Sequence, residues 1–143
     1  MLIESELNAL TWRINKCAMG VHSALGPGLL ESAYHACLLM ELQAEGLRCR
    51  SKVRMPLVYR GVTLDCGYVI DIIVEETVVL ELKVVDALAP VHEAQILTYL
   101  RLTGMPMGLL LNFHVAHMKD GIKRKILVKP LVRGRAAEEP RNP

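Results

Sequence analysis

Apolar side chains in the first part of the chain recur at helical spacing, which predicts a helix over residues 5–24. The Gly-Pro-Gly segment at 26–28 predicts its end, since neither residue type favours a helix interior. A second helix is predicted over 29–44, before Gly46, a residue that commonly terminates helices. The chain therefore begins with two consecutive helices.

The next part of the chain alternates in polarity instead, which is typical of strands. Over 47–54 the alternation predicts one strand face of four basic side chains, which we call the basic ladder: Arg48, Arg50, Lys52 and Arg54. A turn is predicted at 60–61, and Gly67 predicts a break before a further strand over 68–74. Another strand is predicted over 78–85.

The last third returns to the helical period and then to an apolar run. A helix is predicted over 89–103, ended by Gly104, and a buried strand over 108–113. Asp120-Gly121 predicts a tight hairpin after it. The order of elements predicts a mixed α/β (α+β) fold.

Composition narrows the class of protein. A length of 143 residues with 52% hydrophobic content fits one domain, which we place at 1–130, followed by a disordered tail at 131–143. The formal net charge of +2 excludes polyanion binding through bulk charge. No apolar run is long enough to span a membrane and the N-terminus is acidic, so we expect a cytoplasmic protein. The four cysteines form no C-x-x-C pair and are interpreted as reduced packing residues.

Three charged residues interrupt two otherwise apolar predicted strands: Asp71, Glu81 and Lys83. If a short hairpin centred near Glu76 joins the strands, Asp71 and Glu81 lie opposite each other, with Cβ atoms about 5 Å apart. The two like charges repel unless a cation lies between them or one carboxylate keeps a proton. A hard divalent ion, Mg²⁺ or Mn²⁺, is the obvious cation.

Lys83 shares the strand face of Glu81, because side chains alternate along a strand. Two carboxylates, an ammonium group and a metal ion form a plausible apparatus for hydrolysing a phosphodiester. The alternative is a structural ion pair between Glu81 and Lys83 at a partly solvated sheet edge.

Polar residues also occupy helix faces that are otherwise apolar. In the predicted helix over 89–103, His92, Gln95 and Tyr99 form one stripe that faces the interior or a cleft, with Glu93 on the far side. For any one member a satisfied core residue is the favoured interpretation, but that interpretation is weaker for the three together. In the second helix, Glu31 lies on an apolar face and needs a partner, unless it simply favours the helix dipole.

Several of these residues combine into ordered motifs. The segment 28–34 reads Gly-Leu-Leu-Glu-Ser-Ala-Tyr, Asp71 is followed by Glu-Leu-Lys at 81–83, and Gln95 and Tyr99 form a Q-x-x-x-Y pair. Together they resemble the GxxExxY protein family, a small branch of the PD-(D/E)XK nuclease superfamily. The ordered combination is much more specific than any of its parts.

The resemblance covers about residues 5–128 and implies a restriction-endonuclease-like αβββαβ core, with a central mixed sheet flanked by helices. It implies that Asp71 and Glu81 are metal ligands and that Lys83 is the catalytic lysine. It also implies that Glu31 is an accessory carboxylate from the preceding helix.

Two basic regions could contact a polyanion. The basic ladder could follow phosphates, or its charges could merely protect a sheet edge from aggregation. Residues 119–135 carry a net charge of +6, which could equally belong to a solvated hairpin and tail. The chain has only six aromatic residues, which argues against a base-stacking platform for single strands. The predicted contacts in the second region are Lys123, Arg124 and Lys125.

These observations favour a Mg²⁺- or Mn²⁺-dependent nuclease acting on DNA or RNA. Glu31 would assist the metal site directly or through water, and Lys83 would position or activate the attacking water. Gln95 and Tyr99 would orient the site, and His92 would contact the phosphate. The alternatives are a catalytically inert nucleic-acid- or protein-binding module and a purely structural domain with buried ion pairs. The protein could act as a homodimer or as a subunit of a larger complex.

Overall fold

The helical period at the start of the chain produces two helices, α1 (Glu4–Leu25) and α2 (Glu31–Ala44), in a computed structural model that describes residues 2–127. Both agree with the predicted helices to within two residues. Between them, Gly26 and Gly28 have φ angles of +69° and +102°. Glycine adopts such angles without steric cost, so this segment can reverse the chain within a few residues.

The alternating segments form one mixed sheet of five strands in the order β1-β2-β3-β4-β5. β3 pairs in parallel with β4, and the other neighbours are antiparallel. The strands are β1 (Cys49–Tyr59), β2 (Val62–Val74), β3 (Val78–Lys83), β4 (Met107–Asn112) and β5 (Ile122–Ile126). The helix α3 (Pro90–Thr103) connects the parallel pair. The predicted mixed α/β class is confirmed, and the order of elements contains the expected αβββαβ core.

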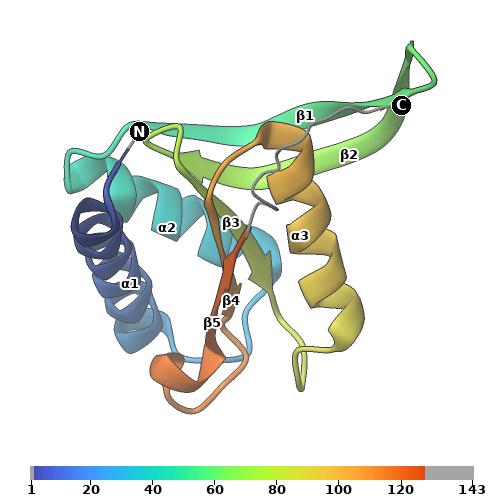
Figure 1. Cartoon of the computed structure of the whole chain (residues 1–143). Helices are drawn as coiled ribbons and strands as arrows, with labels where there is room; N and C mark the ends of the chain where they lie inside the picture. The colour runs from blue at the N-terminus through green and yellow to red at the C-terminus, as the bar shows by residue number, and fades with distance from the viewer. Residues whose placement is uncertain (1, 128–143) are drawn as a thin grey trace.

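Helices cover both faces of the sheet (Figure 1), and each face buries its own hydrophobic cluster. The helix-pair core lies against α1 and α2 and contains Leu82 of β3. The α3 core lies against α3 and contains Val79 of the same strand. Side chains of β3 therefore alternate between two buried layers, which is why this strand is apolar on both faces. A charged side chain in β3 therefore projects from a strand that is covered on both faces.

The predicted break at Gly67 is wrong, because β2 runs without interruption from Val62 to Val74. Gly67 has a φ angle of +76° and lies within an irregular stretch where the β1–β2 register shifts between Met55 and Leu57. A bulge accommodates the extra residues of one strand without ending the pairing. As a result β1 and β2 continue together as a two-stranded arm beyond the rest of the sheet (Figure 1).

The predicted tight hairpin at Asp120-Gly121 is also wrong. A longer connection leaves β4 and ends in a short 3-10 helix, Met118–Gly121, before β5 begins. Gly121 is needed because the backbone passes close to Asn112, and not because of a two-residue turn. A Cβ atom on Gly121 would lie 2.0 Å from the Asn112 carbonyl oxygen.

All four cysteines are free, as expected, but only Cys17 is buried. Cys66 is exposed in the irregular stretch of β2, so its interpretation as a packing residue is wrong. Within residues 2–127, none of the helices combines the length and hydropathy of a membrane-spanning segment. The predicted tail at 131–143 lies outside the described residues.

Candidate active site

β2 and β3 separate at the two carboxylates. Their backbone ladder ends at the pair Ile72–Leu80, although the register would next bring Asp71 opposite Glu81, as the sequence predicts. Beyond that point side chains replace the ladder, because the Asp71 N–H donates to Glu81 Oε2 at 3.0 Å and the Leu82 N–H donates to Asp71 Oδ2 at 2.8 Å. The two carboxylates thus lie together in a fork between the strands.

Glu81 is almost completely buried, with 3% of its surface exposed. Burial, and after it the neighbouring Asp71 carboxylate, raise the pKa of Glu81 to about 8, because both disfavour its negatively charged form. The hydrogen bond from the Asp71 N–H and the charge of Lys83 oppose this rise in the pKa. Without a cation, Glu81 therefore keeps its proton at neutral pH, which is one of the two solutions predicted for the carboxylate pair.

Lys83 projects toward α3, whereas Leu82 packs into the helix-pair core, so the predicted alternation of side chains is confirmed. The Lys83 ammonium group donates a hydrogen bond to Gln95 Oε1 at 3.2 Å. The alternative of a structural Glu81–Lys83 ion pair at a sheet edge is wrong for the described residues, because Lys83 has this different partner and Glu81 is buried in a central strand.

The polar stripe of α3 lies between this helix and β2. The Gln95 amide donates to the Tyr99 hydroxyl at 3.5 Å, and the Tyr99 hydroxyl donates to the Val69 carbonyl at 3.3 Å. These contacts connect the lysine on β3 to the backbone just before Asp71. Burial raises the pKa of Tyr99, so its hydroxyl remains a donor.

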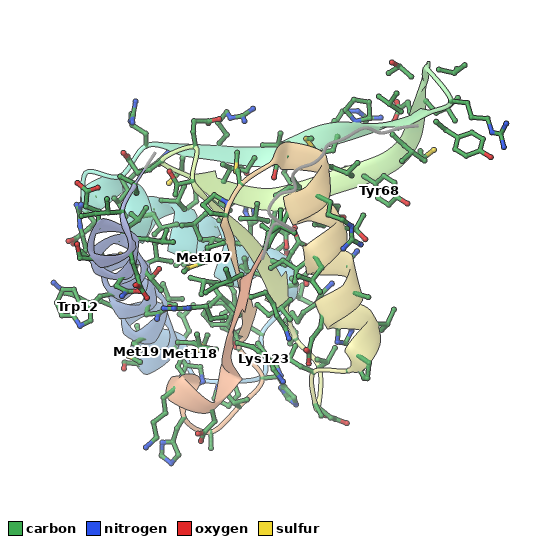
Figure 2. All side chains as sticks on the ribbon, viewed as in Figure 1. Trp12, Met19, Tyr68, Met107, Met118 and Lys123 are labelled. Carbon is green, nitrogen blue, oxygen red and sulfur yellow. The ribbon has the colours of Figure 1, made fainter. Side chains whose placement is uncertain are left out.

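His92 and Glu93, the two polar residues in the first turn of α3, have different hydrogen-bond and ion-pair partners from Gln95 and Tyr99. His92 Nδ1 accepts the Ala89 N–H at 2.9 Å at the start of the helix, so Nε2 carries the proton of the neutral imidazole. Glu93, which was expected on the far side of the helix from the stripe, pairs its carboxylate with Lys123 and Lys125 of β5. Figure 2 labels Lys123 beside the lower part of α3. This side of α3 therefore contacts the last strand.

The motif at residues 28–34 builds the start of α2. The Tyr34 hydroxyl donates to the Gly26 carbonyl and accepts the Leu29 N–H, and its ring stacks on Phe113 with centroids 4.6 Å apart. Tyr34 therefore fixes the preceding loop, and Glu31 is the first residue of the helix that follows.

Glu31 is exposed, and its charge is the smallest of the influences that raise the pKa of Glu81. Within residues 2–127, no three His, Cys, Asp or Glu side chains gather closely enough to hold a metal ion. The structure thus brings Asp71, Glu81 and Lys83 together and leaves Glu31 at the rim, where its role as a direct metal ligand stays a prediction.

Two further residues contact Asp71. His35 was missed as a site residue in the sequence, and Lys52 was predicted only as a member of the basic ladder. Buried His35 of α2 donates from Nε2 to the Asp71 carbonyl at 3.0 Å, and the Ser51 hydroxyl lies 3.3 Å from the same nitrogen. Lys52 Nζ lies 3.7 Å from Asp71 Oδ1. The one sequence signal for His35 is its position one helical turn after Glu31.

The basic ladder does not share one strand face, as was predicted. Cys49 packs against the helix-pair core, but Val53, an even number of positions later, packs against the α3 core. Between them, Lys52 has a φ angle of +55°, and the β1–β2 ladder omits its pairing with Asp71. This left-handed residue inverts the alternation and turns Lys52 toward the site.

The predicted phosphate contacts are mostly engaged within the chain. Three members of the basic ladder form exposed ion pairs, Arg48 with Glu75, Arg50 with Glu76 and Arg54 with Asp65. In β5, Arg124 donates to Asn8 of α1 and its two lysine neighbours contact Glu93. Exposed pairs of this kind are weak, and the role of these side chains as phosphate contacts stays a prediction.

The PD-(D/E)XK nuclease superfamily is the family whose model matches this chain, over residues 8–125. The match covers most of the 143 residues and includes the fork, the lysine and the polar stripe of α3. The chain therefore belongs to the PD-(D/E)XK nuclease superfamily. No curated protein and no solved structure matches it.

Proposed function

We propose that this protein is a metal-dependent nuclease that hydrolyses phosphodiester bonds of DNA or RNA, in the GxxExxY branch of its superfamily. The observation that carries the proposal is the carboxylate pair in the β2–β3 fork, with Glu81 buried and Asp71 partly buried, beside a lysine held by Gln95. The described residues would act as a single domain.

The fork has the donor chemistry that a hard divalent cation prefers. Asp71 and Glu81 each use one oxygen to accept a backbone N–H, which leaves Asp71 Oδ1 and Glu81 Oε1 as oxygen ligands. A cation there would also offset the like-charge repulsion that raises the pKa of Glu81. These residues therefore fit Mg²⁺ or Mn²⁺, with exposed Glu31 reaching the ion directly or through water.

When bound, such an ion would lower the pKa of an attacking water and offset charge on the phosphate. The other steps belong to the chain. Lys83 would hold the attacking water and stabilise charge on a phosphate oxygen, in an orientation fixed by Gln95. Tyr99 would keep α3 against β2, and the Nε2–H of His92 would donate to the phosphate.

Lys83→Ala tests the proposal. The change should reduce cleavage of DNA and RNA substrates in Mg²⁺ or Mn²⁺ by about 100-fold or more, because it removes a positioned charge from the reacting phosphate. Thermal unfolding and Mn²⁺ affinity should remain close to wild type, since Lys83 is only partly buried and forms one side-chain hydrogen bond.

Lys16→Ala is the matched control, because it removes an equal charge from an exposed position of α1, where Lys16 Nζ lies 5.4 Å from the centre of the Trp12 ring. Cleavage should survive in this variant. Full cleavage by Lys83→Ala, or loss of folding in Lys83→Ala alone, would assign the lysine a structural role and contradict the proposal.

An inert binding module is the second candidate. It is favoured by the backbone hydrogen bonds that Asp71 and Glu81 already accept, which would close the fork without any ion. It is also favoured by the lack of a third ligand side chain near them among the described residues. This candidate predicts nucleic-acid or protein binding that needs no divalent ion and no turnover under any condition.

A further inference from the structure

A hollow beside α3 opens next to the candidate active site, and the proposed function leaves it without a role. Its volume is about 330 Å³, and it is bounded by Tyr68 of β2 and by one side of α3 that includes His92, Gln95 and Tyr99. Figure 2 labels Tyr68 on β2, next to the upper part of α3. We call this hollow the Tyr68 pocket.

The Tyr68 pocket is continuous with the site through shared residues. Gln95 lines the pocket and also accepts the hydrogen bond from Lys83. Tyr99 lines it and donates to the carbonyl of Val69, two positions before Asp71. A group bound in the pocket would thus lie beside a phosphate held at the fork.

The walls of the pocket are aromatic and apolar with a few hydrogen-bonding groups. The Tyr68 and Tyr99 rings meet edge to face, with centroids 6.2 Å apart and planes at 84°, and Val91 at the rim is 68% exposed. Nδ1 of His92 accepts the Ala89 N–H, so its Nε2–H can donate either to a phosphate at the fork or to a group in the pocket. No Lys, Arg, Asp or Glu side chain of the described residues lines the pocket, so it does not suit a phosphate group.

We propose that the Tyr68 pocket binds one unstacked nucleobase of the strand whose phosphate lies at the carboxylate fork. An aromatic wall with a few donors suits the face and the acceptor-bearing edge of a base. The volume is at the lower end for ligand sites, which fits one base and not a row of bases. The inference rests on the proposed function and deepens it.

The substrate class follows from this occupant. A base within a duplex is stacked between its neighbours and cannot enter a side pocket unless it is extruded. The substrate is therefore a single strand, or a strand unpaired near the cleaved bond. Scarcity of aromatic residues along the chain is compatible with this, since one base needs one aromatic wall and not an extended platform.

The test is a fluorescence-anisotropy titration of the full chain with a labelled oligonucleotide, as a single strand and as a duplex, made in DNA and in RNA. EDTA is present so that no cleavage occurs. Tyr68→Ala should weaken single-strand binding about tenfold or more, whereas Tyr68→Phe should remain within about twofold, because phenylalanine keeps the ring. Duplex binding should not change. Tyr59→Ala, which removes a 58% exposed tyrosine at the far end of β1, should change neither.

An abasic scan tests the occupant itself. One abasic position in the single strand should remove the difference between wild type and Tyr68→Ala, since the pocket then has no base to bind. Equal binding by wild type and Tyr68→Ala, an equal loss on duplex, or no single-strand binding by wild type would overturn the inference.

Cleavage in Mn²⁺, measured on the same samples, separates the two proposals. Tyr68-dependent binding without cleavage would support the pocket and contradict the nuclease. Cleavage that is unaffected by Tyr68→Ala would support the nuclease and overturn the pocket.

Discussion

Asp71 is held on every side by residues that come from different parts of the chain. Its carbonyl accepts from His35, its N–H donates to Glu81, and its carboxylate accepts from Leu82 and lies near Lys52. Such fixing removes the rotamer freedom that a metal ligand would otherwise lose on binding. The buried partner, Glu81, carries the main energetic cost, because its charged form lies in a poorly solvated position next to a second carboxylate.

Glu81→Gln should change how stability depends on pH. In the unfolded chain the Glu81 carboxyl loses its proton near 4.5, whereas in the folded protein its pKa is raised to about 8. Folding therefore binds a proton between these values, so the free energy of unfolding of the wild type should fall as pH rises from 4.5 to 8 and level off above. Glutamine cannot ionise, and the variant should lack this fall.

Urea unfolding in EDTA across this pH range measures the difference. The free energy of unfolding of Glu81→Gln should exceed that of the wild type increasingly toward high pH, by an amount on the order of a few kcal/mol. Parallel pH profiles for the two proteins would show that Glu81 is already ionised near neutral pH and would refute its raised pKa.

At the scale of elements, the fork is held in place because two helices contact β2 from opposite faces of the sheet. α2 contacts the strand through His35 at Asp71, and α3 contacts it through Tyr99 at Val69. Asn112 of β4 fixes the segment between β3 and α3. Its side-chain oxygen accepts the Val85 N–H at 3.1 Å, and its side-chain nitrogen donates to the Val85 carbonyl at 2.9 Å. The position of α3, and with it Gln95, depends on β4 as well as on its own packing.

Gly121→Ala should therefore destabilise the protein. The added Cβ atom would meet the Asn112 carbonyl oxygen at 2.0 Å, and that atom belongs to the backbone and cannot rotate away. Overpacking of this kind costs about 1–3 kcal/mol. Gly20→Ala is the matched control, because Gly20 lies within α1 and nothing lies within 4 Å of its added Cβ atom.

In a helix interior alanine is favoured over glycine by roughly 0.5–1 kcal/mol, so Gly20→Ala should be neutral or stabilising. Urea unfolding of both variants at one pH checks the contrast. Equal stability of the two would mean that the 3-10 helix Met118–Gly121 can move away from Asn112 without cost, which would contradict the close approach of Gly121 to the Asn112 carbonyl.

At the scale of the whole molecule, the sequence predicts those features that depend on neighbours along the chain. The three helices follow from their apolar period and their terminal glycines, and the meeting of Asp71 and Glu81 follows from the symmetry of a hairpin about Glu76. Local signals were sufficient for these elements.

The features that were missed depend on distant contacts. Gly67 looks like a strand break but forms a bulge, because the long partner strand β1 continues past it. No local pattern predicts a left-handed φ angle at Lys52, since lysine has no preference for that region. The contact of His35 with Asp71 joins α2 to β2 across 36 positions of the chain, which periodicity within one helix cannot reveal.

The central claim is that the carboxylate fork binds a divalent cation, and calorimetric titration of Mn²⁺ tests it most directly. The proteins are the wild type, Asp71→Asn/Glu81→Gln, and the control Glu75→Gln/Glu76→Gln. The control replaces the same number of carboxyl groups by amides, in the turn between β2 and β3, where the two residues pair with Arg48 and Arg50. All three are first shown to be folded.

The account predicts saturable binding to the wild type and the control, and none to Asp71→Asn/Glu81→Gln. Near neutral pH, binding should also release a proton from Glu81, whose pKa is about 8, so the observed heat should vary with the ionisation enthalpy of the buffer. Unchanged binding in Asp71→Asn/Glu81→Gln, or no Mn²⁺ binding by the wild type even with a single-stranded oligonucleotide present, would contradict the claim.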